Sequence, residues 1–271
     1  MSVYTSPRGE ISVATLQAMK RNGEQIAALT AYDASFARVL DSAGVDVVLV
    51  GDSLGMVIQG HATTLPVTVD DMIYHACAVR RGLQRALLMV DMPFMSFATP
   101  DEAAANAGRM MKEAGAHMVK LEGGSAQAAM VHRLNECSIP VCAHLGLKPQ
   151  SVHKIGGYRM QGRDEASARA MVEDALALEA AGADVVLLEC VPAALAREIS
   201  QSLNVPVIGI GSGPDCDGQI LVLHDAIGVT AKPPRFARNF LAGADGIPEA
   251  IVAYVESVRE GRFPGVEETA R

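Results

Sequence analysis

Short apolar runs that end abruptly in charged or glycine residues recur along this chain of 271 residues. Residues 45–50 are almost all β-branched or aliphatic, the pattern of a strand buried on both faces, and Gly51, Asp52 and Ser53 follow directly. Five further runs have this form: 87–90 before Asp91, 118–119 before Lys120 and Glu122, 141–143 before His144, 185–188 before Glu189, and 207–210 before Gly211. A carboxylate directly after a buried strand is unfavourable unless a cation or water compensates it. The pattern therefore predicts one polar rim carried by a set of buried strands.

Segments with helical periodicity alternate with these strands. We expect strands at 26–30, 45–50, 86–91, 117–121, 141–145, 184–189 and 206–211, and helices at 12–21, 35–43, 70–82, 99–114, 125–137, 165–181 and 193–203. Two more helices are expected near 235–242 and 248–261. Seven β/α units and a compressed eighth favour an α/β fold, a (β/α)8 TIM barrel with an N-terminal helix, over a doubly wound sheet. Because no linker or composition shift interrupts the chain, we expect residues 1–271 to form a single barrel domain.

Two segments depart from the alternation. Residues 55–69 do not fit a simple strand-to-helix turn and predict a small β excursion after the second strand, where a lid or a subunit contact would form. Too few residues lie between Gly211 and Gly218 for a full crossover helix. We therefore expect residues 220–223 to be the eighth strand, or a short helix with the strand after it.

The composition argues against nucleic-acid and membrane functions. The net charge is −8, there is no basic block, and aromatic residues make up 4% of the chain with no Trp. No apolar run approaches the length of about 20 residues that spans a bilayer. Residues 1–10 lack the apolar core of a signal peptide, so we expect a cytoplasmic location. The five cysteines are scattered without a CxxC pair, which predicts reduced thiols.

The strand-end carboxylates are candidates for a metal site. In a barrel the carboxyl ends of the strands converge, so Asp52, Asp91 and Glu122 would lie within a small radius. A hard divalent cation would relieve their mutual repulsion, and Mg²⁺ is the default because no Cys/His set with zinc spacing accompanies them. Each carboxylate taken alone could equally be a cap or an ion-pair partner. Their occurrence after successive or near-successive strands favours the metal site.

The remaining rim residues suggest acid–base chemistry. Lys120 and Glu122 share parity on their strand, so Lys120 is either an anion clamp or a simple partner of a carboxylate. Glu189 has apolar neighbours that would raise its pKa, which suits a general base, although a buried ion pair is the alternative. His144 is either a hydrogen-bond donor in the site or a core histidine. A cation with a separate base can remove a proton next to a carbonyl, and a 2-oxo acid held in this way would form an enolate for C–C bond chemistry.

Several motifs resemble those of the ketopantoate hydroxymethyltransferase family, and the resemblance extends from about residue 15 to residue 263. The matching stretches are Thr30-Ala-Tyr-Asp33, Val50-Gly-Asp-Ser-Leu-Gly-Met56, Gln59-Gly-His61, Thr64-Leu-Pro-Val-Thr68, Asp91-Met-Pro-Phe94, Val119-Lys-Leu-Glu-Gly-Gly124, Ala143-His-Leu-Gly-Leu147, Pro149-Gln-Ser151, Gly156-Gly-Tyr158, Leu188-Glu-Cys-Val-Pro192, Gly209-Ile-Gly211 and Asp217-Gly-Gln219. The resemblance implies transfer of a hydroxymethyl unit from 5,10-methylenetetrahydrofolate to 3-methyl-2-oxobutanoate. The reaction would pass through a metal-stabilised enolate and give ketopantoate for pantothenate and coenzyme A biosynthesis.

The resemblance also assigns roles to individual residues. It implies that Asp52 and Asp91 are magnesium-site aspartates that also contact the substrate, and that Glu122 is the associated acidic residue. The resemblance further implies a homo-oligomer, typically a decamer, without nucleic-acid or membrane partners. The other implied roles are oxo-acid contacts for Ser53 and Lys120, the base for Glu189 and a neighbouring substrate contact for His144.

Two other functions remain open from the sequence. A Mg²⁺-dependent oxo-acid lyase or phosphoenolpyruvate-type mutase could use a similar barrel, but those enzymes usually carry a catalytic cysteine loop or phosphate-binding arginines at the rim. A non-catalytic barrel used for binding or assembly would be expected to have lost several of the rim carboxylates. The rim positions identified above contain no such cysteine or arginine, and they retain every carboxylate. An assay for folate-dependent hydroxymethylation would separate these functions.

Overall fold

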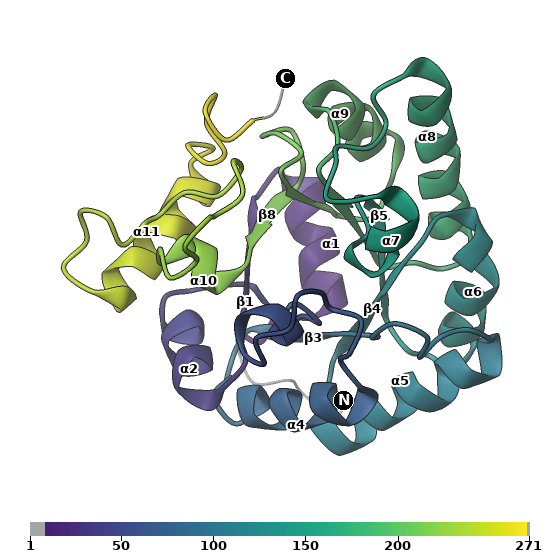
Figure 1. Ribbon diagram of the computed structural model, residues 1–271, viewed down its shortest axis with the longest axis horizontal. Coiled ribbons are helices and arrows are strands. Elements are labelled where there is room, and N and C mark those ends of the chain that lie inside the picture. Colours follow the sequence, from purple (N-terminus) through teal and green to yellow (C-terminus); the bar gives the residue numbers. More distant parts are fainter. Residues whose placement is uncertain (1–8, 270–271) are drawn as a thin grey trace, which may run out of the picture.

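The computed structural model describes residues 9–269 and contains a closed barrel of parallel strands (Figure 1). The strands pair in sequence order from β1 to β8, and β8 pairs with β1. This topology confirms the predicted (β/α)8 TIM barrel. The strands are β1 (Ile26–Thr30), β2 (Val47–Val50), β3 (Leu87–Asp91), β4 (Met118–Glu122), β5 (Val141–Gly146), β6 (Val185–Glu189), β7 (Val207–Ile210) and β8 (Gly218–Leu221).

Helices surround the barrel as an outer ring, which Figure 1 shows in sequence order from purple to yellow. Some of the longer helices begin with a side-chain cap; for example, Thr99 accepts a hydrogen bond from the backbone N–H of Glu102 at the start of α5. The α-helices are α1 (Val13–Asn22), α2 (Ala34–Ser42), α3 (Leu54–Val57), α4 (Val69–Arg80), α5 (Pro100–Ala114), α6 (Ala128–Glu136), α7 (Val152–Ile155), α8 (Glu165–Ala180), α9 (Ala193–Ser202), α10 (Leu223–Ala226) and α11 (Ile247–Arg259), and the 3₁₀ helices are η1 (Ser125–Gln127) and η2 (Pro149–Ser151).

Helix α1 covers the amino-terminal end of the barrel. Its Lys20 Nζ donates hydrogen bonds to Ser200 O and Asp217 Oδ2, both at 2.8 Å, and Asp217 directly precedes β8. Leu16 on the same helix is fully buried. Because this end is closed, the opposite end, where the strands terminate, is the one left for a functional site.

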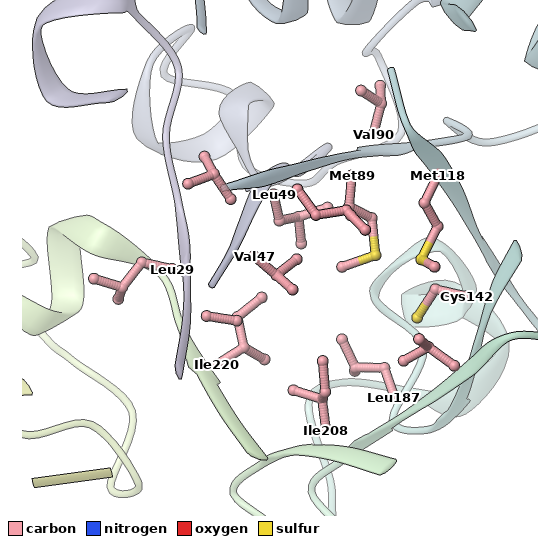
Figure 2. Packing of buried hydrophobic residues seen from close by; sticks show 14 of the residues in the cluster. Leu29, Val47, Leu49, Met89, Val90, Met118, Cys142, Leu187, Ile208 and Ile220 are labelled. Atoms are coloured by element: carbon pink, nitrogen blue, oxygen red, sulfur yellow. The ribbon is translucent and has the colours of Figure 1, made fainter. Parts of the chain in front are cut away.

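Side chains that point inward along each strand fill the barrel. Figure 2 shows Met89, Met118 and Cys142 pointing into the barrel, whereas Leu29 and Val90 on neighbouring positions point outward. This alternation has a period of two residues, so Lys120 and Glu122 lie on the same inward side as Met118. The lower part of the barrel is therefore an apolar core, and the same rows of side chains become polar toward the carboxyl ends.

The eighth β/α unit is compressed, as the sequence predicts. Strand β8 is followed by the single-turn helix α10, which is too short to cover the seam between β8 and β1. Helix α11 takes its place: the hydroxyl of Tyr254 donates to Ala28 O at 2.8 Å and to Gln219 O at 3.0 Å. The eighth strand lies two residues earlier than the expected 220–223.

The predicted β excursion at residues 55–69 is wrong. The segment contains the short helix α3 and turns, and no residue between α3 and α4 forms a strand. A closed barrel has no free edge with which an extended segment could pair. The segment is instead held by side-chain packing, because a Cβ atom at Gly55 would lie 2.6 Å from Cγ2 of the buried Val67.

The helix expected at residues 235–242 is also wrong. This stretch forms turns, in which Asn239 Oδ1 accepts hydrogen bonds from the backbone N–H groups of Leu241 at 2.9 Å and Ala242 at 3.3 Å. Such local side-chain bonds compete with helical backbone bonds. The backbone N–H of Phe240 donates to Ala226 O at 2.8 Å, which ties the turn to α10.

The expectations on membrane-spanning helices and on free cysteines can be checked in the described residues, whereas the one on a signal peptide falls mainly outside them. Between residues 9 and 269, no helix has both the length and the apolar character needed to cross a membrane. All five cysteines are free thiols. The expectation that residues 1–10 lack a signal-peptide core falls mainly on residues 1–8, which lie outside the described residues.

Candidate active site

The carboxyl ends of the strands surround a cavity of about 120 Å³. One side of its wall is apolar and includes Leu187, Ile210 and Phe236. Every site residue predicted from the sequence lines this cavity, namely Asp52, Ser53, Asp91, Lys120, Glu122, His144 and Glu189. Residues that are far apart in the sequence therefore meet at one place, as expected for the mouth of a barrel.

A buried ion pair joins β3 and β4 at the floor of the cavity. Lys120 Nζ donates to Asp91 Oδ1, and the two residues are direct partners in the β3–β4 register. The second oxygen of the same carboxylate accepts a hydrogen bond from the backbone N–H of Asp52 at 3.0 Å. Because both oxygens of Asp91 are engaged in this way, its carboxylate is fixed in orientation.

Gln150 connects two of the acidic side chains. Its Nε2 donates to Asp52 Oδ2 at 2.9 Å and to Met92 O at 3.0 Å, while its backbone N–H donates to Glu122 Oε2 at 3.1 Å. Gln150 belongs to η2, which directly follows β5 and covers one side of the cavity. In the sequence this glutamine stands within a motif shared with the family, and nothing in its spacing indicates a role.

His144 lies between two carboxylates. Its Nδ1 is 3.7 Å from Glu122 Oε1, and its Nε2 is 3.3 Å from Glu189 Oε2. Neither ring nitrogen has a hydrogen-bond partner of good geometry among the described residues. Gly146 permits the approach of β5 to β6 here, because a Cβ atom at its φ of 91° would lie 2.2 Å from Glu189 O. The side chains of Glu122, His144 and Glu189 thus form one row across the cavity.

Ser53 is held by an aromatic hydroxyl. The hydroxyl groups of Tyr32 and Ser53 are hydrogen-bonded at 2.8 Å, and Tyr32 is buried directly after β1. Burial raises the pKa of Tyr32 above its ordinary value, so the phenol stays neutral. In the sequence Tyr32 stands out only as part of a motif, because a strand-end tyrosine alone does not indicate which hydroxyl it contacts.

Burial dominates the electrostatics of the cavity. It raises the pKa of Asp52 to about 7, with repulsion from Asp91 as the next cause, and it raises the pKa of Glu122 well above its usual value. Burial also raises the pKa of Glu189 to about 7. Burial and the charge of Lys120 lower the pKa of His144, so its imidazole is neutral near pH 7.

Lys120 keeps its charge under these conditions. Burial alone would lower the pKa of Lys120, but the charges of Asp91 and Glu122 more than compensate and raise it above the ordinary value. Among the residues that line the cavity, four carboxyl groups therefore face a single ammonium group. Burial and mutual repulsion favour the protonated forms of several of these carboxyl groups, and an additional cation would favour their ionised forms.

The donor set of the cavity fits a hard divalent cation. Within residues 9–269, no group of three His, Cys, Asp or Glu side chains is arranged to hold a metal ion, so a preformed three-carboxylate site is not found. Mg²⁺, however, is commonly held by one or two carboxylates, with water or substrate in its other positions. Asp52 and Asp91 satisfy that requirement. Glu122 lies close enough for its charge and that of Asp52 to repel each other, and a cation would relieve this repulsion.

Comparisons with known proteins identify the family of this chain. Residues 10–266 match the family model described as ketopantoate hydroxymethyltransferase. A 3-methyl-2-oxobutanoate hydroxymethyltransferase of Halorhodospira halophila is 62% identical over 259 residues, which cover 96% of this chain and 94% of the relative. The enzyme of that name from Alkalilimnicola ehrlichii is 60% identical over 258 residues, covering 95% of this chain and 93% of the relative.

A more distant likeness concerns the fold alone. The solved structure of phosphonopyruvate hydrolase in complex with oxalate and Mg²⁺ superposes with a TM-score of 0.62 at 14% identity and covers 95% of this chain and 93% of that one. That agreement supports the barrel architecture independently of the sequence motifs. The family match over nearly the whole chain and the relatives at 60% identity or more lead to one conclusion: the chain belongs to the ketopantoate hydroxymethyltransferase family.

Proposed function

We propose that this enzyme transfers a hydroxymethyl unit from 5,10-methylenetetrahydrofolate to C3 of 3-methyl-2-oxobutanoate in a Mg²⁺-dependent reaction, giving ketopantoate for pantothenate and coenzyme A biosynthesis. The observation that carries the proposal is the pairing, in one cavity, of the acidic cluster around Lys120 with Glu189, a separate carboxyl group whose pKa lies near neutrality. Family membership and the names of the relatives support the substrate and the product. The cytoplasmic location, the decameric assembly and the single barrel domain rest on the family resemblance and the uninterrupted chain.

The floor of the cavity binds and orients the oxo acid. Lys120 uses one N–H to reach Asp91, and its ammonium group has two further N–H donors for the substrate carboxylate or the C2 oxygen. The hydroxyl of Ser53, fixed by Tyr32, offers another hydrogen bond. A divalent cation held by Asp52 and Asp91 would polarise the keto oxygen and so make the C3 proton more acidic.

Glu189 acts as the general base. Its carboxylate takes the proton from C3, the electron pair of the C–H bond moves into the C2–C3 bond, and negative charge develops on the C2 oxygen. The ammonium group of Lys120 lies in the same cavity and stabilises that charge. Water adds to the methylene carbon of the donor, both bonds from that carbon to nitrogen break, and tetrahydrofolate leaves with the two hydrogens of the water. C3 then bonds to the released one-carbon unit, which is at the oxidation level of formaldehyde, and its oxygen takes the proton held by Glu189 and becomes the hydroxyl group.

His144 lies beside Glu189 without competing for the proton. Its imidazole is neutral because burial lowers its pKa, and its Nε2 lies 3.3 Å from the Glu189 carboxylate. A neutral ring leaves the carboxylate basic, whereas an imidazolium would hold it as a strong ion pair. His144 therefore packs beside the base and leaves it able to accept the proton.

The proposal is tested by hydrogen exchange at C3 of 3-methyl-2-oxobutanoate, followed by NMR in D₂O with and without Mg²⁺ and tetrahydrofolate. We expect exchange that requires Mg²⁺ and proceeds without the folate, because proton removal precedes the transfer. Addition of 5,10-methylenetetrahydrofolate should convert the oxo acid to ketopantoate. Cleavage of a C–C or P–C bond in a lyase or mutase substrate, without C3 exchange, would instead identify a different barrel enzyme.

A further inference from the structure

A second cavity, of about 220 Å³, adjoins the reaction cavity on the side of Glu122. Glu122 lines both cavities, and Gln150, which bonds Asp52, lines the second one. Its other walls come from the segment that follows β3 and from η1, α6 and η2, through Phe94, Met95, Phe97, Gln127, Met130 and Ser151. Neither His144 nor Glu189 lines it, so this cavity opens at the end of the Glu122–His144–Glu189 row that is remote from the base.

The segment 94–98 is held in a conformation that its own residues do not favour. Met95 has a φ of 66°, in the left-handed region that residues with a Cβ atom rarely adopt. The side chains of Phe94 and Met95 are nevertheless 46% and 59% exposed, and the buried hydroxyl of Ser96 has no hydrogen-bond partner among the described residues. Asn106 Nδ2 donates to Ser96 O at 2.7 Å and fixes the segment to α5. Such local conflicts cluster at ligand-binding sites, where the fold maintains them for function.

The chemistry of the walls suits a flat heteroaromatic ring. Phe94 and Phe97 offer aromatic faces, and Met95 and Met130 offer polarizable thioethers that pack well against rings. Gln127 adds an amide, and its Oε1 is shielded from solvent without a hydrogen-bond donor in the described part of the chain. A ring that carries N–H groups at its edge would satisfy both the apolar faces and this unpaired acceptor.

We propose that this second cavity binds the pterin ring of the one-carbon donor. The inference rests on the proposed function, which requires such a donor beside C3 of the oxo acid. Glu189 occupies one end of the row across the reaction cavity, so an electrophile has access from the Glu122 end, where the second cavity opens. The shared wall at Glu122 brings the bound ring next to the reacting carbon, and its exposed edge at Phe94 and Met95 leaves room for the rest of the donor to extend into solvent.

A second copy of this chain is the competing occupant of the exposed Phe94 and Met95 side chains. The lining residue Glu122, shared with the reaction cavity, favours the ring, because a subunit contact has no need of a hollow that borders the acidic cluster. Gln127 Oε1, which lacks a hydrogen-bond donor among the described residues, also favours a ring with N–H groups over a subunit contact. The two occupants also predict different experimental outcomes.

The test measures the Kd of (6S)-tetrahydrofolate by calorimetry, with the full-length enzyme, Mg²⁺ and saturating 3-methyl-2-oxobutanoate. Phe94→Ala should raise this Kd roughly tenfold through the lost ring stacking, and Gln127→Leu about fivefold through the lost hydrogen bond. The matched control is Tyr74→Ala, which removes an even more exposed aromatic ring from α4, outside the lining of the cavity, and should leave the Kd unchanged. The Kd of the oxo acid, measured in each variant, reports whether the reaction cavity is intact.

Several results would overturn the assignment. If the wild-type enzyme transfers the hydroxymethyl unit and both cavity variants keep the wild-type Kd of tetrahydrofolate, the pterin ring does not bind in this cavity. The proposed function is then unaffected. A Phe94→Ala variant with an altered sedimentation coefficient and an unaltered Kd identifies a subunit contact. A wild-type enzyme that neither exchanges the C3 hydrogen nor binds tetrahydrofolate disproves the proposed function, and the inference fails with it.

Discussion

Gln150 Nε2 donates a hydrogen bond to Asp52 Oδ2 at 2.9 Å, across 98 residues of sequence. This contact holds one oxygen of the Asp52 carboxylate and leaves the other free to turn toward a cation or substrate. Through its backbone N–H the same residue also fixes Glu122 Oε2. The orientation of two acidic side chains in the reaction cavity therefore depends on one uncharged residue that approaches them from a loop.

The first prediction concerns this glutamine. Gln150→Ala should raise the Mg²⁺ concentration needed for half-maximal turnover by about 10–100-fold, the usual effect of losing a residue that orients a metal ligand. Gln161→Ala is the control, because Gln161 lies in the same β5–α8 connection and, within residues 9–269, its Nε2 donates only to Arg159 O. Titration of turnover with Mg²⁺ measures the effect. An unchanged Mg²⁺ requirement, with changed oxo-acid binding, would move Gln150 from metal orientation to substrate contact.

The second prediction separates the two aspartates. Asp52→Asn should abolish Mg²⁺-dependent turnover without lowering the melting temperature, because burial and the charge of Asp91 already disfavour its ionised form. Asp91→Ala should also abolish turnover, but it leaves Lys120 buried without its ion-pair partner, which destabilises a fold by about 3–5 kcal/mol. Calorimetric unfolding and turnover at limiting Mg²⁺ are measured together. Full activity in both variants would disprove their assignment to the metal site.

Much of the fold and of the site could be predicted because strand periodicity is visible in the sequence. The shared parity of Lys120 and Glu122 predicts that both point to the same side of their strand, and the structure confirms it. Buried runs that end in a carboxylate identify the barrel mouth, since polar residues are tolerated there only when they serve a site. All seven predicted site residues line one cavity for this reason.

The features that the sequence does not reveal lie outside the strands and helices, where there is no periodic pattern of apolar residues to read. Gln150 follows a strand in a loop, and its importance comes from contacts with Asp52 and Glu122 that sequence spacing does not reveal. The residue pattern at 55–69 predicts an extended segment. It does not reveal that the closed barrel has no free sheet edge with which such a segment could pair. At 235–242, the side chain of Asn239 accepts a hydrogen bond from the backbone N–H of Leu241, and this local bond competes with the helix that the periodicity predicts.

The third prediction concerns Lys120. Lys120→Ala should raise the Kd of 3-methyl-2-oxobutanoate by about 10–100-fold, because a charge-assisted hydrogen bond to the substrate is lost. The variant should also melt at a lower temperature, since Asp91 loses its buried partner. Calorimetric titration well below the melting temperature separates the two effects, with Lys112→Ala on α5 as the control. Wild-type affinity in a destabilised Lys120→Ala would leave Lys120 with a structural role only.

The fourth prediction links Glu189 to the pH dependence of stability. Its folded-state pKa of about 7 lies above the ordinary value of 4.5, so the folded state binds more protons between these values. Stability is therefore lost as pH rises from 4.5 through 7. Glu189→Gln cannot ionise, and its stability relative to wild type should grow over that window to at most about 3 kcal/mol. Denaturant unfolding in a chelator, at pH 4.5 to 8.5, measures the difference. A difference that does not vary with pH would show that Glu189 has an ordinary pKa.

The fifth prediction is that Glu189 removes the C3 proton. Glu189→Gln keeps the shape of the side chain but cannot accept a proton, so C3 exchange should fall by about 10²–10⁴-fold. Binding of Mg²⁺ and the oxo acid should survive, because the Asp52, Asp91 and Lys120 contacts are unchanged. In the wild type, exchange at low substrate should lose about a factor of ten per pH unit below an inflection near or below 7, since only the ionised base reacts and a bound cation lowers its pKa further. NMR exchange rates and calorimetric binding are measured on the same preparations. Exchange at the wild-type rate in the variant would assign proton removal to another group, whereas lost exchange with intact binding would confirm Glu189 as the base.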